Sequence, residues 1–152
     1  MRTIPRAESF RSRPSPSHDG CAVLNEECGL MISGIGVDIV DVADFASRLA
    51  RGQLARIFSE QELMYAKSRP AQRDEILSAR WAAREAFAKA IGTGLRAEWP
   101  LDQIEVVHGG EGRPEIRLGP ALKDLLPPKT RIVCSLSHTP SYAVAFVCIE
   151  QD

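Results

Sequence analysis

The chain has 152 residues, of which 44% are hydrophobic and 26% charged, and its formal net charge is −1 at pH 7. This composition is typical of an ordinary soluble single domain. The near-neutral charge argues against non-specific binding to nucleic acid or to a membrane surface, and no apolar run approaches the roughly 20 residues of a bilayer span. We therefore expect neither nucleic acid nor a membrane as a partner, and any phosphate chemistry has to use local charge.

The first thirty residues differ in composition from the rest of the chain. Arginine is mixed with serine and proline there, and no hydrophobic period is present. Such a segment cannot offset its ordering entropy by burial. Its acidic residues count against a transit peptide, and a secretory apolar core is missing. We expect residues 1–30 to be a disordered extension or the result of a start codon placed too early. Met31 would then begin a single domain, residues 31–152.

From Met31 the sequence reads M-I-S-G-I-G-V-D-I-V-D, in which apolar residues alternate with two glycines and Asp38. This alternation predicts a β-strand with one apolar face. The glycines clear the other face of side chains, so that a ligand or a second backbone can come close. Asp38 stands alone on that cleared face. A capping role is better suited to Asp41 and Asp44, which precede the next helix.

Three helices are predicted in the middle of the chain. The first follows Asp41 and carries apolar residues at i, i+3 and i+7 from Val42, and the second opens at a capping box, Ser59–Glu62, and ends by Pro70. The third is the run S-A-R-W-A-A-R-E-A-F-A-K-A-I-G-T-G, which is dense in alanine and straight-chain charged residues. These residues favour a helix, and the final glycines end it near Gly92.

The third helix carries two adjacent stripes. At 100° per residue, Trp81, Glu85 and Lys89 lie on one stripe and alanines form a small-residue stripe beside it. A carboxylate one turn before an ammonium is either a solvated i,i+4 pair or a metal or phosphate clamp, and on the helix alone the solvated pair is favoured.

The pattern changes to short strands after the third helix. Residues 104–108 and 116–118 predict one hairpin, residues 121–126 a short helix stopped by two prolines, and residues 131–138 and 142–149 a second hairpin. Helices segregated from mostly antiparallel strands indicate an α+β fold, a mostly antiparallel sheet with helices packed on it.

A histidine and two cysteines stand in the last strands. His138 follows the strand S-L-S-H and has serine and threonine neighbours that suit phosphate oxygens, whereas His108 is expected to be a hydrogen-bonded surface residue. Cys134 and Cys148 lie in apolar runs, and no cysteine spacing in the chain is that of a zinc or redox site. We expect both to be small buried residues in a reducing cytosol.

Three motifs together resemble a known family: G-I-G-V-D-I-V, R-W-A-A-R-E-A-F-A-K-A-I-G-T-G and S-L-S-H-T. They stand in the order found in the holo-acyl-carrier-protein synthases, the small trimeric 4′-phosphopantetheinyl transferases, and the resemblance covers about Met31 to the C-terminus. It implies the 4′-phosphopantetheinyl transferase fold. The implied reaction transfers the phosphopantetheine arm of coenzyme A to a serine of an acyl carrier protein, releases adenosine 3′,5′-bisphosphate, and supports fatty acid biosynthesis in the cytoplasm.

The resemblance also implies the metal site. Asp38 matches the aspartate of the first motif and Glu85 the glutamate of the second, which together hold Mg²⁺, an ion that usually takes one or two carboxylates. Lys89 matches a family lysine and is placed to neutralise phosphate, so Glu85 and Lys89 are the candidate catalytic residues. The group that takes the serine proton stays open: Glu85, Asp38 acting through a water of the metal, or water itself.

Coenzyme A contacts follow by the same matching of positions. Arg84 departs from the lysine that is common before the motif glutamate, and because arginine is planar and multiply donating, phosphate contacts there should differ. Relatives hold coenzyme A between neighbouring protomers of a homotrimer, and we expect the same here. The implied coenzyme A-binding residues are Arg80, Arg84, Lys89, Gly92, His138 and Thr139.

The helix that docks the acidic carrier in relatives departs as well. Relatives often carry a basic residue six positions after the motif aspartate, where this chain has Asp44. Arg48, Arg51 and Arg56 are the candidates to replace it.

Two other classes of function compete with the transferase. One is a non-catalytic module that binds coenzyme A or a carrier protein, but a pure binder has no need of two metal-binding carboxylates. The other is a hydrolase or a different phosphotransferase that uses the same metal pair, and no Walker-type glycine loop supports it.

Overall fold

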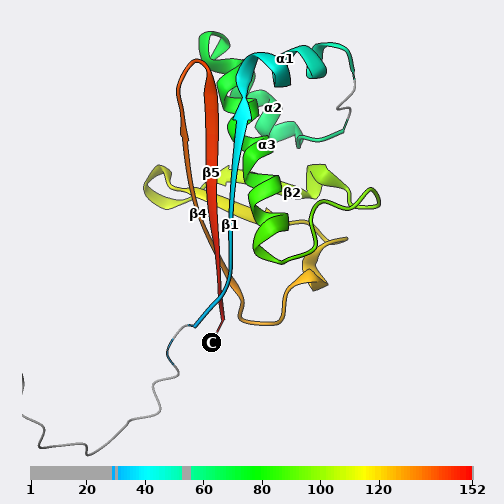
Figure 1. The fold of residues 1–152 in the computed structure, drawn as a ribbon, viewed down its shortest axis with the longest axis vertical. Helices are drawn as coiled ribbons and strands as arrows, with labels where there is room; N and C mark the ends of the chain where they lie inside the picture. Colours follow the sequence, from blue (N-terminus) through cyan, green and yellow to red (C-terminus); the bar gives the residue numbers. More distant parts are fainter. Residues whose placement is uncertain (1–28, 30, 53–55, 152) are drawn as a thin grey trace, which may run out of the picture.

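The computed structural model describes residues 29, 31–52 and 56–151 (Figure 1). The expected extension, residues 1–30, lies outside the described residues except for Gly29, so that prediction stays a prediction. The main elements are β1 (Met31–Asp41), α1 (Val42–Ala50), α2 (Glu60–Lys67), α3 (Arg73–Ala90), β2 (Ile104–His108), β3 (Pro114–Leu118), β4 (Arg131–His138) and β5 (Tyr142–Gln151). Short 3₁₀ helices connect them: η1 (Pro70–Gln72), η2 (Leu101–Gln103), η3 (Gly110–Gly112) and η4 (Lys123–Leu125).

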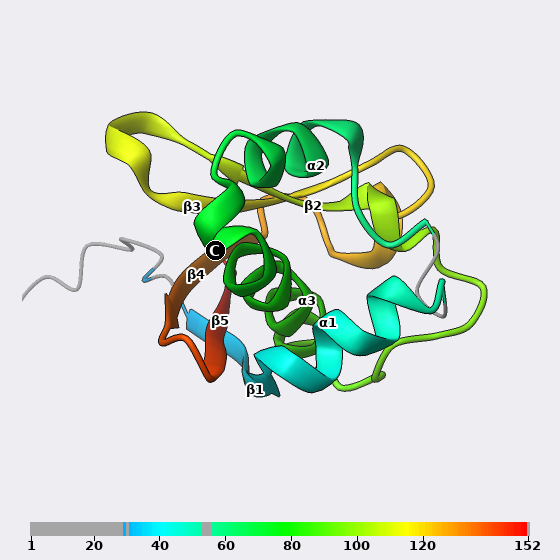
Figure 2. The same cartoon turned by 90° about the horizontal axis from the view of Figure 1, so that it is seen from above.

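The strands form two antiparallel sheets. One has the order β1-β5-β4, and the other is the β2–β3 hairpin. Figure 1 shows β1, β5 and β4 side by side, with α3 along one face of their sheet. Seen from above in Figure 2, α3 lies between that sheet and the layer of α2 and the hairpin, with α1 beside it. The predicted α+β class and both predicted hairpins are confirmed.

The small-residue stripe of α3 packs directly on β1. Ala82 and Ala86 are fully buried. A Cβ atom added at Gly36 would overlap the carbonyl oxygen of Ala86, and one at Gly34 that of Ala90. The sequence analysis allowed either a ligand or a second backbone to approach the glycine face of β1. The structure shows that the backbone of α3 packs there.

The apolar face of β1 points away from α3. Ile35, Val37 and Ile39 are 56%, 56% and 67% exposed. Val133 of β4 and Phe146 of β5 are also exposed. The strand register places these side chains on the same side of the sheet, and we call the five together the outer sheet face.

Local signals set the ends of the first two helices. Asp41 caps α1 by accepting a hydrogen bond from the backbone N–H of Asp44. The predicted capping box of α2 forms between Ser59 and Glu62.

The expected helix over residues 121–126 is wrong, because only the single 3₁₀ turn η4 forms there. A segment this short before two prolines cannot repay the cost of helix nucleation. Within the described residues, no helix is both long and apolar enough to span a bilayer.

Candidate active site

Asp38 and Glu85 meet at one cavity, although they are far apart in the sequence. Asp38 extends from β1 and Glu85 from α3, and both line a cavity of about 250 Å³ beside α1. The close packing of β1 on α3 brings them together, because no side chain at Gly36 keeps the two backbones apart. The structure therefore joins the two carboxylates that the sequence assigned to the metal.

Lys89 lies one helical turn beyond Glu85 and contacts the same site. Its Nζ donates hydrogen bonds to Oδ1 of Asp38, at 2.7 Å, and to the carbonyl oxygen of Val37, at 3.1 Å. The lysine side chain is half-exposed, whereas that of Asp38 is largely buried. Among the described residues, Lys89 therefore forms its ion pair with this carboxylate from the sheet and not with Glu85, its i,i+4 neighbour on the helix. The ammonium is thus held against Asp38, one of the residues that line the cavity.

The pKa of Glu85 is shifted by the groups around it. Burial raises the pKa of the Glu85 carboxyl above its usual value, and the negative charge of Asp38 raises it further. Lys89 and Arg48 act in the opposite direction and lower the pKa of Glu85. Two carboxylates held close together in a partly buried site are stabilised by a bound cation.

The donor set suits Mg²⁺. The described residues contain no cluster of three or more side chains of the kind that would enclose a metal ion. A site with two carboxylates still fits Mg²⁺, which commonly takes one or two carboxylates and completes its shell with water and substrate phosphate. These side chains therefore do not form a closed structural metal site. They suit an open site in which a phosphate ligand completes the coordination of the metal.

Arg84 lies on the other side of α3 and is occupied by protein acceptors. Its guanidinium forms a bidentate pair with the carboxylate of Glu62, and it also donates to the carbonyl oxygens of Leu101 and Arg80. The side chain is fully buried. The structure therefore contradicts the prediction that Arg84 contacts a coenzyme A phosphate, because no part of its guanidinium reaches the surface.

Arg80 is also remote from the Asp38–Glu85 pair. Its side chain is 6% exposed and lies between α3, α2 and β2, with Nε 3.9 Å from the carboxylate of Glu62. The structure separates this arginine from Lys89, with which the sequence had grouped it.

The remaining expected coenzyme A contacts lie at chain turns. Gly92 follows α3 with a φ of +78°, a conformation that glycine adopts without strain. His138 ends β4 and is exposed, and the strand register places its side chain on the α3 side of the sheet. The Thr139 hydroxyl accepts hydrogen bonds from the backbone N–H groups of Ser141 and Tyr142, so it organises the β4–β5 turn.

Sequence reasoning missed two residues of the site. Arg48 of α1 and Trp81 of α3 both line the cavity with Asp38 and Glu85, and the Trp81 ring stacks on Phe45 at 5.8 Å. The spacing of Trp81, one turn before Glu85 on the same stripe, could have identified it. Arg48 had been assigned to carrier docking only.

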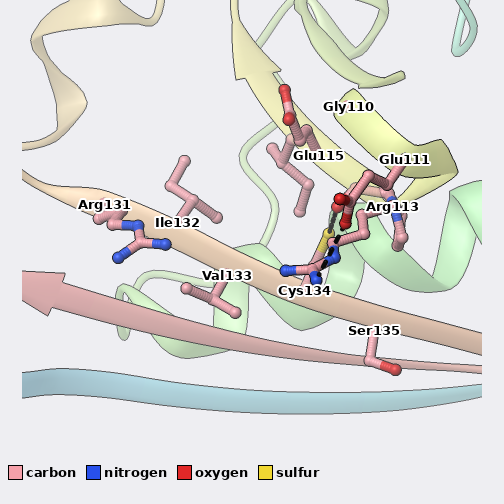
Figure 3. A pocket seen from close by; sticks show the side chains of 11 residues that line it. Gly110, Glu111, Arg113, Glu115, Arg131, Ile132, Val133, Cys134 and Ser135 are labelled. Carbon is pink, nitrogen blue, oxygen red and sulfur yellow. Dashed lines mark hydrogen bonds and ion pairs between the residues drawn. The ribbon is translucent and has the colours of Figure 1, made fainter. Parts of the chain in front are cut away.

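A larger cavity, of about 810 Å³, lies elsewhere. Figure 3 shows side chains of β4 on one side of it and those of η3 and β3 on the other. Its lining includes Arg113 and Arg131 but neither Asp38 nor Glu85. We favour the smaller cavity as the candidate site, because size alone supplies no reactive group and two carboxylates line the smaller cavity.

Comparisons with known proteins give the family of this chain. The family model of the 4′-phosphopantetheinyl transferase superfamily matches residues 34–147, a range that contains Asp38, Glu85, Lys89 and His138. A holo-[acyl-carrier-protein] synthase of Geobacter sulfurreducens is 40% identical over 128 residues, which cover 80% of this chain and 99% of that protein.

Solved structures are similar as well. A holo-[acyl-carrier-protein] synthase of Neisseria meningitidis has a TM-score of 0.70 at 34% identity and covers 80% of this chain and 100% of its own. A holo-(acyl-carrier-protein) synthase of Bacillus anthracis, solved in complex with CoA (3′,5′-ADP), has a TM-score of 0.67 at 30% identity, with 82% and 100% of the two chains covered.

Proposed function

This chain belongs to the 4′-phosphopantetheinyl transferase superfamily, and we propose that Asp38 and Glu85 hold the Mg²⁺ ion that supports its reaction. The enzyme is a holo-[acyl-carrier-protein] synthase. It transfers the 4′-phosphopantetheine moiety of coenzyme A to a serine hydroxyl of apo acyl carrier protein. The products are holo-acyl carrier protein and adenosine 3′,5′-bisphosphate. The observation that carries the proposed metal site is that two carboxylates line one cavity, with the Lys89 ammonium paired to one of them, Asp38.

The chemistry is a displacement at phosphorus. The serine oxygen forms a bond to the β-phosphorus of coenzyme A, and the bond from that phosphorus to the bridging oxygen of the pyrophosphate breaks. Mg²⁺ bound by Asp38 and Glu85 would neutralise charge on the pyrophosphate. Lys89, whose ammonium contacts Asp38, contributes a further positive charge toward the leaving phosphate.

The residues proposed to bind the rest of coenzyme A are Lys89, Gly92, His138 and Thr139. Gly92 follows Lys89 at the end of α3, where an absent side chain lets the ligand approach the backbone. His138 and Thr139 stand at the β4–β5 turn. Arg80 stays a proposed phosphate contact, but because it lies away from Lys89 it would meet a different phosphate group.

We also propose that the protein is a homotrimer with its coenzyme A sites between protomers. Support comes from the outer sheet face, whose exposed apolar side chains are of the kind that mark protein interfaces. Light scattering after size exclusion should give the mass of a trimer. A Val37→Glu variant should lose that mass, whereas Met64→Glu, at an exposed methionine of α2, should keep it.

The setting proposed for the enzyme is fatty acid biosynthesis in the cytoplasm. The acyl carrier protein is then the macromolecular partner. The proposed docking residues for its acidic surface are Arg48, Arg51 and Arg56. Arg51 follows α1 and is exposed, as is Arg56.

The direct test is intact mass spectrometry of apo acyl carrier protein mixed with this protein, coenzyme A and Mg²⁺. We expect the carrier to gain the mass of one phosphopantetheine group, and an EDTA control to abolish the gain because Mg²⁺ is withdrawn. Coenzyme A binding without any gain on several apo carriers would favour the non-catalytic module. Breakdown of coenzyme A in the absence of a carrier would favour a hydrolase.

A further inference from the structure

Helix α1 forms one wall of the cavity that contains Asp38 and Glu85, and it places an arginine there. Figure 2 shows α1 beside α3, and residues of both helices and of β1 line this cavity of about 250 Å³. Arg48, in the last turn of α1, is the one cationic side chain among the described residues that line it. The cavity therefore has carboxylates on the walls formed by β1 and α3 and a guanidinium on the wall formed by α1.

Arg48 lies near these carboxylates but forms no ion pair with them. Its positive charge lowers the pKa of the Glu85 carboxyl, so the guanidinium is close enough to interact electrostatically with that group. Among the acidic side chains that the structure describes, none forms an ion pair with Arg48. The ammonium of Lys89, in contrast, is already paired with Asp38. The N–H donors of Arg48 are therefore available to a ligand in the cavity.

The next arginine along the chain is placed differently. Arg51 follows α1, is exposed, and donates from Nη1 to the hydroxyl of Ser47 at 2.8 Å. It does not line the cavity, whereas Arg48 lines it and is only partly exposed. In the sequence both arginines are charges near the end of one amphipathic helix, and both were expected to dock the carrier. The structure separates them, because only Arg48 reaches the carboxylates.

The transfer reaction needs positive charge on two sides of the reacting phosphorus. The serine oxygen bonds to the β-phosphorus as the bond from that phosphorus to the bridging oxygen breaks. Adenosine 3′,5′-bisphosphate leaves with the bridging oxygen, and the serine proton is released to solvent. During this displacement, negative charge is spread over the leaving phosphate and over the non-bridging oxygens of the transferred group, and the attacking and leaving oxygens are roughly in line.

The arrangement of the cavity divides these two charges between two cations. Lys89 of α3 is the residue proposed to face the leaving phosphate. A carrier docked on α1 brings its serine from that side, so the in-line geometry places the transferred group between α1 and the leaving phosphate. Arg48 is the described cation on the α1 wall.

We propose that Arg48 is a further catalytic residue, whose guanidinium donates hydrogen bonds to the non-bridging oxygens of the phosphoryl group while it is transferred. The planar fork of N–H groups in arginine matches two oxygens on one phosphorus. Contacts with charge that develops only during the reaction raise kcat rather than affinity. The inference rests on the transferase reaction and on the proposed docking of the carrier at α1. It assigns Arg48 to the chemistry and leaves docking to Arg51 and Arg56.

Steady-state transfer assays separate these two roles. They use the full-length protein with Mg²⁺, coenzyme A and apo acyl carrier protein. Arg48→Gln should lower kcat about 100-fold or more, the usual effect of removing one donor to charge in the transition state, and should change the KM for the carrier less than about threefold. Arg51→Gln is the matched control on the same helix. It should keep the wild-type kcat and raise the KM for the carrier, because it removes a charge at the rim of the docking surface.

Chemical rescue gives a second readout, which a purely structural role of Arg48 would not change. Arg48→Ala removes the guanidinium from the cavity wall, and guanidinium chloride at a concentration too low to denature the protein should restore part of the lost contact. We expect the kcat of Arg48→Ala to rise at least about tenfold. Sodium chloride at the same concentration should not raise it, and neither salt should accelerate the wild type.

Each other outcome rejects the inference in a recognisable way. A wild-type kcat in Arg48→Gln, with or without a higher KM, would overturn it and leave Arg48 as a docking residue. A low kcat in Arg48→Ala that responds equally to guanidinium chloride and sodium chloride would also overturn it, because Arg48 would then act on the structure alone. Absence of transfer by the wild type on several apo carriers would overturn the reaction and this inference together. Transfer by the wild type with an unaffected kcat in Arg48→Gln would reject the inference alone.

Discussion

Helix α3 presents two charged regions that the protein treats in opposite ways. Arg84 and Glu85 are adjacent in sequence, but Arg84 is fully buried with its guanidinium held by Glu62, whereas Glu85 lies at an open cavity beside a second carboxylate. We call Arg84 and Glu62 the matched region, because their opposite charges pair within the protein and stabilise the fold. We call Asp38 and Glu85 the open region, because two negative side chains lie together at a cavity where a ligand can bind. The difference shows that the degree to which a charge is satisfied, rather than its position in a motif, separates a structural residue from a functional one.

The largest effect should come from breaking the matched region. Glu62→Gln leaves Arg84 buried without a counter-charge, and we expect the free energy of unfolding to fall by about 3–5 kcal/mol. Urea denaturation followed by circular dichroism measures this loss. Glu98→Gln removes one partner of an exposed ion pair and should cost at most about 1 kcal/mol. Equal losses in the two variants would show that the Glu62 pair is no more important than a surface contact.

The converse prediction concerns the open region. Glu85→Gln should lower the rate of phosphopantetheine transfer about 100- to 1000-fold, the usual effect of losing one electrostatic group at a reacting phosphate or carbonyl. Its free energy of unfolding should not fall, because the change removes a partly buried carboxylate whose pKa is raised by burial and further by Asp38. Single-turnover mass spectrometry of the carrier and a parallel urea titration give the two numbers.

A matched control lies on the same helix. Glu75 lies in the first turn of α3 and does not line the cavity, so the Glu75→Gln variant should transfer phosphopantetheine at the wild-type rate. A folded Glu85→Gln protein that transfers at the wild-type rate with Mg²⁺ would reject the role assigned to Glu85.

The two regions also differ in how well sequence predicted them. The stripe of Glu85 and Lys89 follows from helical periodicity, and the cleared face that carries Asp38 follows from strand alternation. Each of these patterns involves only residues that are near one another in the sequence, so periodicity could not predict that Asp38 and Glu85 lie together. The family resemblance predicted this, and in the structure both residues line one cavity.

The matched region was misjudged because its key contact is not local. The capping box correctly predicted that Glu62 begins a helix, but not that the same carboxylate reaches Arg84, which is 22 residues further along the chain. Because the sequence does not show the contact with Glu62, Arg84 was expected to contact phosphate. Periodicity likewise identified an apolar face on β1 but not which way it points, and Val37 is exposed because α3 covers the glycine face.

A smaller effect should follow from disturbing the contact between β1 and α3 that brings Asp38 to Glu85. Gly36→Ala would place a methyl group against the carbonyl oxygen of Ala86, and we expect the displaced helix to cost about 1–3 kcal/mol of stability. Transfer should fall too, because Asp38 and Glu85 would move apart. Thermal unfolding and the transfer assay measure the two losses.

Gly110→Ala is the matched control for Gly36→Ala. A Cβ atom at Gly110 meets nothing within 4 Å, so this variant should be at least as stable as the wild type. Comparable losses in both variants would mean that the close approach of α3 to β1 is unimportant.

The smallest effect concerns Cys134, which is half-buried and not fully buried as the sequence predicted, whereas Cys148 is buried as expected. Cys134 donates its thiol proton to the carbonyl oxygen of Pro114, and burial raises its pKa to about 11, with a further increase from the negative charge of Glu115. Since the thiolate is the reactive form, alkylation of folded Cys134 by iodoacetamide at pH 8 should be at least about 100-fold slower than in urea. The folded-state rate should then rise about tenfold per pH unit up to roughly pH 10. Peptide mapping by mass spectrometry follows this one site. Alkylation of folded Cys134 at the rate of a free thiol would show that solvent reaches the α3 side of the sheet at β4, and that burial does not raise the pKa of this thiol.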